Sequence, residues 1–382
     1  MLNFEHDLRN GESDDNDWPA TKTVIVLGAG ASRGSSLVSD NLQPPLIRDF
    51  FACGDKLGIL AKEDFKPLWS YLETEGGISF SRILELESKG FINIEHIYSL
   101  ISQLDNEKDV ERLLERFVYE VLTATTQVYR DKTCHFHDLL LEKLKPDVII
   151  SFNYDLIIDK SMASLYPGWE TDHISQFAMA FNGEKFIKTD EYLSGYTQDQ
   201  MNGAQYPQLF KLHGSLNHYY DVTLFERTRA RARWDEIRTG YIVPLRYAFD
   251  TPRVYQSRPL RDYAPSTIQT STEEWAYDRQ RAELKLDLIP PIWNKERTDW
   301  DHIIAELRQA KKMVFIGYSM ADIDLWALRM FRLAYLKHQY KKELKIEVVN
   351  RNPIVTERIQ SSYFESQISN KSQALYEYVS QL

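Results

Sequence analysis

The chain has 382 residues, of which 43% are hydrophobic and 13% aromatic, with a formal net charge of −10. This length and composition predict one large domain with insertions, or two domains, and exclude general disorder. The acidic balance argues against broad binding to a nucleic-acid backbone or to an anionic membrane surface, although a local basic patch near Arg227–Arg233 is compatible with it.

The cysteine content and the N-terminal sequence indicate the compartment. Cys53 and Cys134 alone build neither a disulfide framework nor a four-cysteine zinc site. Residues 1–20 lack the apolar core of a signal peptide, and no window approaches the roughly 18 apolar residues of a membrane span. We therefore expect a cytoplasmic protein with no membrane association.

The first third of the chain predicts a strand followed by a large helical insertion. Residues 1–20 are polar and predict a flexible acidic tail, and Thr23–Leu27 reads as a central parallel strand. Residues 51–132 are mainly helical in pattern, most clearly over Asp109–Tyr129. Because this stretch is too long for a simple crossover, we interpret it as an insertion into a domain that spans residues 21–382.

The remainder alternates helices with short apolar strands. Helices are expected at His135–Leu144, Leu156–Leu165, Asp301–Gln309, Ile323–Leu336 and after Pro353, and strands at Asp147–Ser151, Leu209–Leu212, Leu286–Ile289, Met313–Ile316 and Lys345–Val349. Residues 166–208 predict loops or small strands, and residues 219–283 an irregular insertion or lid. This alternation predicts an α/β fold with a Rossmann-like, mostly parallel sheet.

A glycine-rich turn follows the first strand. The run Gly28-Ala29-Gly30-Ala31-Ser32 offers backbone N–H groups without an obstructing Cβ, which is the chemistry that a dinucleotide pyrophosphate requires. Arg33 stands where the third glycine of the common fingerprint belongs, so a plain tight turn is the alternative.

Polar side chains also follow two other strands. Asn153 could hold a water or a ribose hydroxyl, whereas Asp155 could instead cap the next helix. His213 lies between an apolar run and Gly214-Ser215, and its near-neutral intrinsic pKa suits a general base, with a structural role as the alternative. We hypothesise that the glycine turn and the strand ends that carry Asn153 and His213 form one NAD site, with Asn153 and His213 at its reacting end.

Later strand ends offer weaker signals. Gly317-Tyr318-Ser319 could approach the cofactor and Asn350 could bind a ribose hydroxyl, but Ser319 and Asp322 could merely cap a helix. Cys134, His135 and His137 fit no common zinc spacing, so we expect no metal. Glu95 and His96 are expected on a solvated helix face.

In this order, the motifs resemble the sirtuin-like superfamily, and specifically the bacterial sirtuin-like NAD hydrolases of antiphage defence. The resemblance rests on Gly28–Ser32, Phe152–Asp155, Lys211–Ser215, Gly317–Asp324, Asn350 and the run Pro290–Lys295. It implies NAD as substrate, with Gly28, Ala29, Gly30 and Ser32 at the phosphates, and Asp155 also in the cofactor site. It further implies Asn153 positioning the attacking water, His213 as base, and Gly317, Ser319 and Asn350 along the adenosine.

The resemblance also implies how such an enzyme is controlled. NAD hydrolysis is toxic to the cell, which predicts a homo-oligomer triggered in trans. The expected partner is a ring-shaped DNA-translocating ATPase, with an Argonaute-type protein or a cyclic nucleotide as alternatives. The missing zinc cysteines argue against a sirtuin-type protein deacylase. A non-catalytic NAD or ADP-ribose binding module remains the other alternative, and a nuclease-like role finds little support in an acidic chain.

Overall fold

The computed structural model describes residues 20–34, 43–103, 108–177, 179–183, 186–196, 206–221, 240–249, 284–288, 299–320, 324–363 and 365–382. Residues 1–19 of the expected tail, the basic run Arg227–Arg233, Asp322 and the Pro290–Lys295 motif lie outside these ranges, as does most of the expected lid. No helix in the described ranges has the length and apolar character needed to cross a membrane.

A six-stranded parallel sheet is the centre of the molecule and confirms the predicted α/β, Rossmann-like fold class. Its order is β11-β10-β9-β1-β2-β5, and every neighbouring pair is parallel. The strands are β1 (Lys22–Leu27), β2 (Val148–Ser151), β5 (Gln208–Lys211), β9 (Ala310–Ile316), β10 (Lys345–Val349) and β11 (Gln367–Lys371). When the strands of this sheet are numbered in chain order, their arrangement across the sheet is that of doubly wound dinucleotide-binding folds. In this protein the strand order reverses between β1 and β9.

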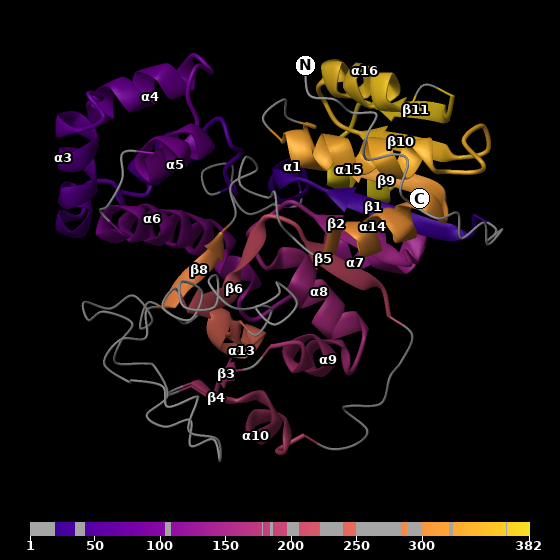
Figure 1. Cartoon of the computed structure of the whole chain (residues 1–382), viewed down its shortest axis with the longest axis horizontal. Coiled ribbons are helices and arrows are strands. Elements are labelled where there is room, and N and C mark those ends of the chain that lie inside the picture. The colour runs from indigo at the N-terminus through magenta and orange to yellow at the C-terminus, as the bar shows by residue number, and fades with distance from the viewer. Residues whose placement is uncertain are drawn as a thin grey trace, which may run out of the picture.

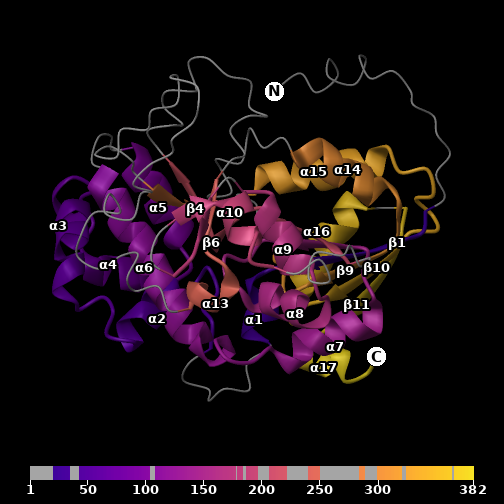
Figure 2. The same cartoon turned by 90° about the horizontal axis from the view of Figure 1, so that it is seen from below.

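Helices cover both faces of this sheet, which explains why the central strands are continuously apolar. Val24 and Val26 of β1 point to one face, packing with α14 (Asp299–Arg308), α15 (Leu325–Leu336) and α16 (Pro353–Ser362). Ile25 and Leu27 point to the other face, packing with α7 (His135–Leu144), α8 (Ile157–Leu165) and α17 (Leu375–Val379). Figures 1 and 2 show these two layers around the sheet.

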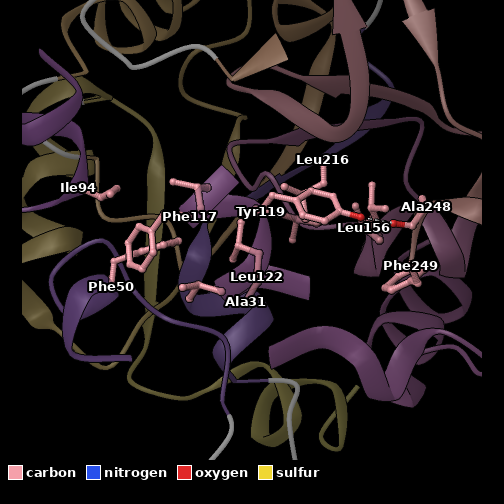
Figure 3. Close-up of a cluster of buried hydrophobic side chains, with 14 of the residues drawn as sticks. Ala31, Phe50, Ile94, Phe117, Tyr119, Leu122, Leu156, Leu216, Ala248 and Phe249 are labelled. Atoms are coloured by element: carbon pink, nitrogen blue, oxygen red, sulfur yellow. Dashed lines mark hydrogen bonds between the residues drawn. The ribbon is translucent and has the colours of Figure 1, made fainter. Parts of the chain in front are cut away.

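Residues 50–129 form the predicted helical block between β1 and β2, which lies to one side of the sheet in both views (Figures 1 and 2). Its elements are α2 (Phe50–Lys56), η1 (Glu63–Phe65), α3 (Lys66–Thr74), α4 (Phe80–Ser88), α5 (Ile94–Gln103), α6 (Lys108–Thr126) and η2 (Gln127–Tyr129). Its buried side chains join one apolar cluster with the α7–α8 face of the sheet, from Phe50 and Phe117 to Ala31 of α1 (Ala29–Arg33) and Leu156 (Figure 3). The division into an interrupted domain stays a prediction.

A second, mixed sheet corrects one expected strand. Its order is β4-β3-β7-β6-β8, with the strands β3 (Met179–Phe181), β4 (Phe186–Lys188), β6 (Gly214–Asp221), β7 (Tyr241–Ile242) and β8 (Leu284–Leu288). The helices α9 (Trp169–Ser175), α10 (Thr189–Leu193) and α13 (Leu245–Ala248) accompany it. The run at Leu286–Ile289 was expected to continue the main sheet, but β8 pairs antiparallel with β6 instead. Apolar content predicts a buried strand without specifying its partner.

Candidate functional site

The candidate site lies where the strand order reverses, at the carboxyl ends of β1 and β9. In doubly wound folds, ligands bind at this edge. The two loops that leave it are packed backbone to backbone. The N–H of Gly28 donates to the carbonyl of Ile316, and the N–H of Gly30 donates to the carbonyl of Gly317, each over 3.0 Å.

The glycines of both loops are required by this close packing. A Cβ on Gly30 would lie 2.7 Å from the Gly317 Cα, and a Cβ on Gly317 would lie 2.1 Å from the Ala31 nitrogen. Gly317 also has a φ of +60°, a conformation that disfavours residues with a Cβ. The backbone N–H groups of Gly28 and Gly30 thus bind protein carbonyls here, and their predicted role in holding phosphates stays a prediction.

Asn153 and His213 leave neighbouring strands at the same edge of the sheet. In the pairing of β2 with β5, Ser151 lies opposite Lys211. Asn153 and His213 each follow this pair by two residues. Adjacent strands lie only about 4.8 Å apart. The register therefore places Asn153 and His213 at neighbouring strand ends on one edge of the sheet.

The Asn153 amide is held against the glycine turn in a defined orientation. Its Nδ2 donates to the Gly28 carbonyl over 3.0 Å and to the Ser32 hydroxyl over 2.9 Å. Because a carbonyl only accepts, the NH₂ must face Gly28 and the Oδ1 must face away. That Oδ1 is buried and finds no hydrogen bond among the described residues, which leaves one acceptor available for a bound group.

Ser32 and Asp155 continue the hydrogen-bond network that holds the Asn153 amide. The Ser32 hydroxyl donates to Asp155 Oδ2 over 2.6 Å, while Asp155 Oδ1 accepts from the Ile157 N–H at the start of α8. Asp155 therefore bonds the first N–H of α8, as the capping alternative predicted, and it also binds the Ser32 hydroxyl. Both side chains are buried, and their predicted contact with the cofactor stays a prediction.

His213 occupies the turn that separates the two sheets. β5 ends at Lys211, and Gly214, with a φ of +87°, turns the chain into β6. The imidazole lies edge-on to the Phe152 ring at 5.0 Å between centroids and is 6% exposed. Its Nε2 lies 3.3 Å from Asp324 Oδ2, without hydrogen-bond alignment. The described residues give Nδ1 no hydrogen bond, so Nδ1 is the nitrogen left for a substrate.

Asp324 is a site residue that the sequence reasoning missed. Its Oδ1 caps α15 by accepting from the Ala327 N–H, and its Oδ2 accepts from the Tyr318 hydroxyl over 3.1 Å. The sequence left capping by Ser319 open as an alternative, and in the structure Asp324 takes this role. The signal was present in the Asp-x-Asp spacing of residues 322 and 324, since the second carboxylate directly precedes the helix.

The adenosine-side candidates lie around the same loop. Gly317 contacts the glycine turn, while Ser319 is exposed. Asn350 ends β10, and its Nδ2 donates to the Tyr318 carbonyl over 3.3 Å while its Oδ1 accepts from the Asn352 N–H. Asn350 thus ties the β10 end to the β9 loop, and its contact with a ribose stays a prediction.

Glu95 corrects another expectation. His96 is exposed, as expected, but Glu95 on the same turn of α5 is only 7% exposed. Burial, and then the negative charge of Asp324, raise the pKa of Glu95 from 4.5 to about 8. A carboxyl from the helical block therefore belongs to the electrostatic surroundings of the His213–Asp324 pair.

A buried ion pair lies beneath the site. Lys211 Nζ binds Asp159 Oδ2 over 2.9 Å, and both side chains are almost fully buried. Lys211 also donates to the Asp155 carbonyl. The lysine of the Lys211–Ser215 motif thus anchors β5 to α8 and is turned away from solvent. Within the described ranges, no group of three or more His, Cys, Asp and Glu side chains is arranged to hold a metal ion.

Comparisons with known proteins return similarity in structure alone. No family model matches the sequence, and no curated protein matches it. Among solved structures, the chain is similar to Sir2 with the inhibitor EX-527, 2'-O-acetyl-ADP-ribose and a deacetylated p53 peptide, at 13% identity and TM-score 0.40, over 94% of this chain and 91% of that one. It is also similar to Sir2 with a p53 peptide and NAD+, at 11% identity and TM-score 0.36 over the same shares.

Proposed function

We propose that the protein is an NAD+ glycohydrolase that cleaves the nicotinamide–ribose bond and releases nicotinamide and ADP-ribose. The observation that carries this proposal is the placement of Asn153 and His213 two residues beyond the Ser151–Lys211 pair of the sheet, with the Asn153 amide bonded to the glycine turn. Asn153 Oδ1, which has no hydrogen bond among the described residues, and the His213 imidazole supply a water-holding group and a base at the edge where a dinucleotide is expected.

In the proposed reaction, the C1'–N bond of NAD+ breaks and nicotinamide leaves with the electron pair. Oxocarbenium-like positive charge then develops on the ribose, and a water attacks C1' from the opposite face. Asn153 Oδ1 accepts a hydrogen bond from this water and orients it. His213 Nδ1 takes the proton that the water loses, while Asp324 near Nε2 stabilises the imidazolium that forms.

Nicotinamide release tests the proposal directly. Removing a positioned acid–base group typically costs 10²–10⁴-fold in rate, so Asn153→Ala and His213→Ala should each lose at least about 100-fold. His135→Ala is the matched control, because His135 is exposed on α7. Circular dichroism and thermal unfolding verify the fold of each variant. A folded His213→Ala protein with wild-type turnover would refute the assignment.

We further propose that the enzyme acts in antiphage defence as a homo-oligomer and is triggered in trans. A ring-shaped DNA-translocating ATPase is the favoured activator, with an Argonaute-type protein or a cyclic nucleotide as alternatives. The shared apolar core supports control of this kind, because a shift of the helical block would reach Ala31 of the glycine turn. Nicotinamide release is therefore expected to rise when the product of a neighbouring gene is added. Full constitutive turnover by a free monomer would contradict this regulation.

A non-catalytic NAD or ADP-ribose binding module is the second candidate. It is favoured by the burial of the reacting pair, since Asn153 and His213 are only 7% and 6% exposed. Calorimetric binding of ADP-ribose without nicotinamide release, measured with activating partners present, would support this candidate over the enzyme.

A further inference from the structure

Tyr318, in the loop after β9, contacts three separate parts of the proposed site. Its backbone packs against the glycine turn, because a Cβ on Gly28 would lie 2.5 Å from the Tyr318 Cα. Its carbonyl accepts from Asn350 Nδ2 at the end of β10 over 3.3 Å. Its ring stacks on Phe152 with the two centroids 4.2 Å apart. These contacts fix both the backbone and the ring of Tyr318, which is only 5% exposed.

The Tyr318 hydroxyl fixes the orientation of the Asp324 carboxylate. It donates to Asp324 Oδ2 over 3.1 Å, while Asp324 Oδ1 accepts from the Ala327 N–H. Burial, and then the charge of Asp324, raise the pKa of Tyr318 well above its usual value, so this hydroxyl stays a donor. Because each carboxylate oxygen accepts from a different donor, the group cannot rotate freely. Its Oδ2 is held 3.3 Å from His213 Nε2.

The ring of Tyr318 reaches His213 by a second route, through Phe152. The Tyr318 and Phe152 rings are stacked at an interplanar angle of 16°. Phe152 meets the imidazole of His213 at 81°, with centroids 5.0 Å apart. Phe331 packs against both stacked rings, at centroid distances of 6.2 and 6.3 Å. The supported Phe152 ring therefore limits the tilt of the imidazole.

We propose that Tyr318 is a positioning residue of the NAD site proposed above, which fixes His213 as the tautomer that carries its proton on Nε2. A neutral imidazole has one protonated nitrogen, so this tautomer leaves Nδ1 able to accept a proton. A negatively charged oxygen 3.3 Å from Nε2 favours a proton on that nitrogen. This inference rests on the proposed function and deepens it, because it explains why Nδ1 rather than Nε2 serves as the base.

The tautomer of His213 is the primary measurement, because it requires no turnover. Long-range ¹H–¹⁵N correlation spectra of protein labelled with ¹⁵N-histidine distinguish a protonated ring nitrogen from an unprotonated one, and His213→Gln assigns the signal. At about pH 9, well above the intrinsic pKa of an imidazole, the wild type should carry its proton on Nε2. Tyr318→Phe keeps the ring and removes only the hydroxyl, so the released carboxylate should leave a mixture of the two tautomers.

Tyr363→Phe is the matched control for the loss of a buried hydroxyl. Tyr363 belongs to the same apolar cluster as Tyr318 and Phe152, and its hydroxyl has no hydrogen bond among the described residues. This control should retain the Nε2 tautomer. Asp324→Asn tests the direction of the effect. The Ala327 N–H requires the amide oxygen as its acceptor, so the NH₂ should face Nε2 and move the proton to Nδ1.

The steady-state constants provide the second measurement. Tyr318→Phe should lower kcat for nicotinamide release by at least about tenfold and leave KM within about twofold, because the hydroxyl orients the base and not the substrate. Tyr363→Phe should retain the wild-type kcat. A wild type with its proton on Nδ1, or a folded Tyr318→Phe variant with the wild-type tautomer, overturns the proposal. Failure of the NADase assignment alone is seen separately, as the expected tautomers without nicotinamide release.

Discussion

At the scale of single residues, some buried polar atoms in and near the proposed site lack hydrogen-bond partners among the described residues, as do others elsewhere. Asn153 Oδ1, His213 Nε2 and Glu95 Oε2 have no hydrogen bond among the described residues. An unsatisfied buried polar group costs about 1–3 kcal/mol, and native proteins concentrate such groups where they serve function. Asn153 Oδ1 and His213 Nε2 lie at neighbouring strand ends of the parallel sheet, which is where the proposed site needs polar groups.

The conformations of two glycines give a residue-scale prediction. Gly317 and Gly58 have similar φ values of +60° and +68°, but a Cβ on Gly317 meets backbone atoms whereas one on Gly58 meets nothing within 4 Å. Gly58→Ala should therefore lower the free energy of unfolding by only about 1 kcal/mol, which is the cost of left-handed strain. Gly317→Ala should lower it by at least about 2 kcal/mol more, because its Cβ also meets backbone atoms. Urea denaturation of both variants measures this gap. Equal losses would show that the two loops are not packed as described.

At the scale of elements, the strand ends are fixed by polar ties as well as by apolar packing. Lys211 connects β5 to α8 through Asp159, and Asn350 connects β10 to the β9 loop. These ties lie beneath or beside the residues proposed to react. The Lys211 contacts fix the end of β5 against α8, two residues before His213.

The Lys211–Asp159 pair gives an element-scale prediction. Lys211→Met leaves the Asp159 carboxylate buried without its cation and should lower the free energy of unfolding by about 3–5 kcal/mol. The double variant Lys211→Met, Asp159→Leu removes both charges and should recover most of that loss. Chemical denaturation of the two variants tests the pair, and a double variant as unstable as the single one would contradict a buried pair.

At the scale of the whole molecule, the helical block and the parallel sheet share one apolar cluster, and Glu95 of the block is a buried carboxyl whose pKa is raised mainly by burial. The stability of the molecule should therefore depend on the protonation of this carboxyl. Since the folded protein raises the pKa of Glu95 from 4.5 to about 8, the folded state holds a proton that the unfolded chain releases between these values. This stabilisation is complete below pH 4.5 and is lost as the pH rises to about 8.

The corresponding prediction compares Glu95→Gln with the wild type at two pH values. From pH 6 to pH 8, the free energy of unfolding of the wild type should fall relative to that of Glu95→Gln by about 2 kcal/mol, given a limiting slope near 1.4 kcal/mol per pH unit. Urea denaturation at both pH values measures this change. A constant difference between the two proteins would mean that Glu95 is ionised throughout this range.

The sequence by itself determined the α/β class, the strands of the parallel sheet except β11, the helical block and the positions of Asn153 and His213. It did so because continuous apolar strands, helical periodicity and small residues after strands are local signals. β11 was missed because Gln367–Lys371 is a polar, largely exposed edge strand that carries no such signal.

Only the tertiary structure decided which strands pair and which distant side chains meet. It assigned β8 to the second sheet, placed Asp324 against His213 and buried Glu95, which its helical position had suggested to be solvated. The physical reason is that burial, charge and hydrogen bonding at this edge depend on contacts between segments far apart along the chain. A local pattern shows what a residue can do, and the packing of the helical block against the strand ends determines which groups surround it.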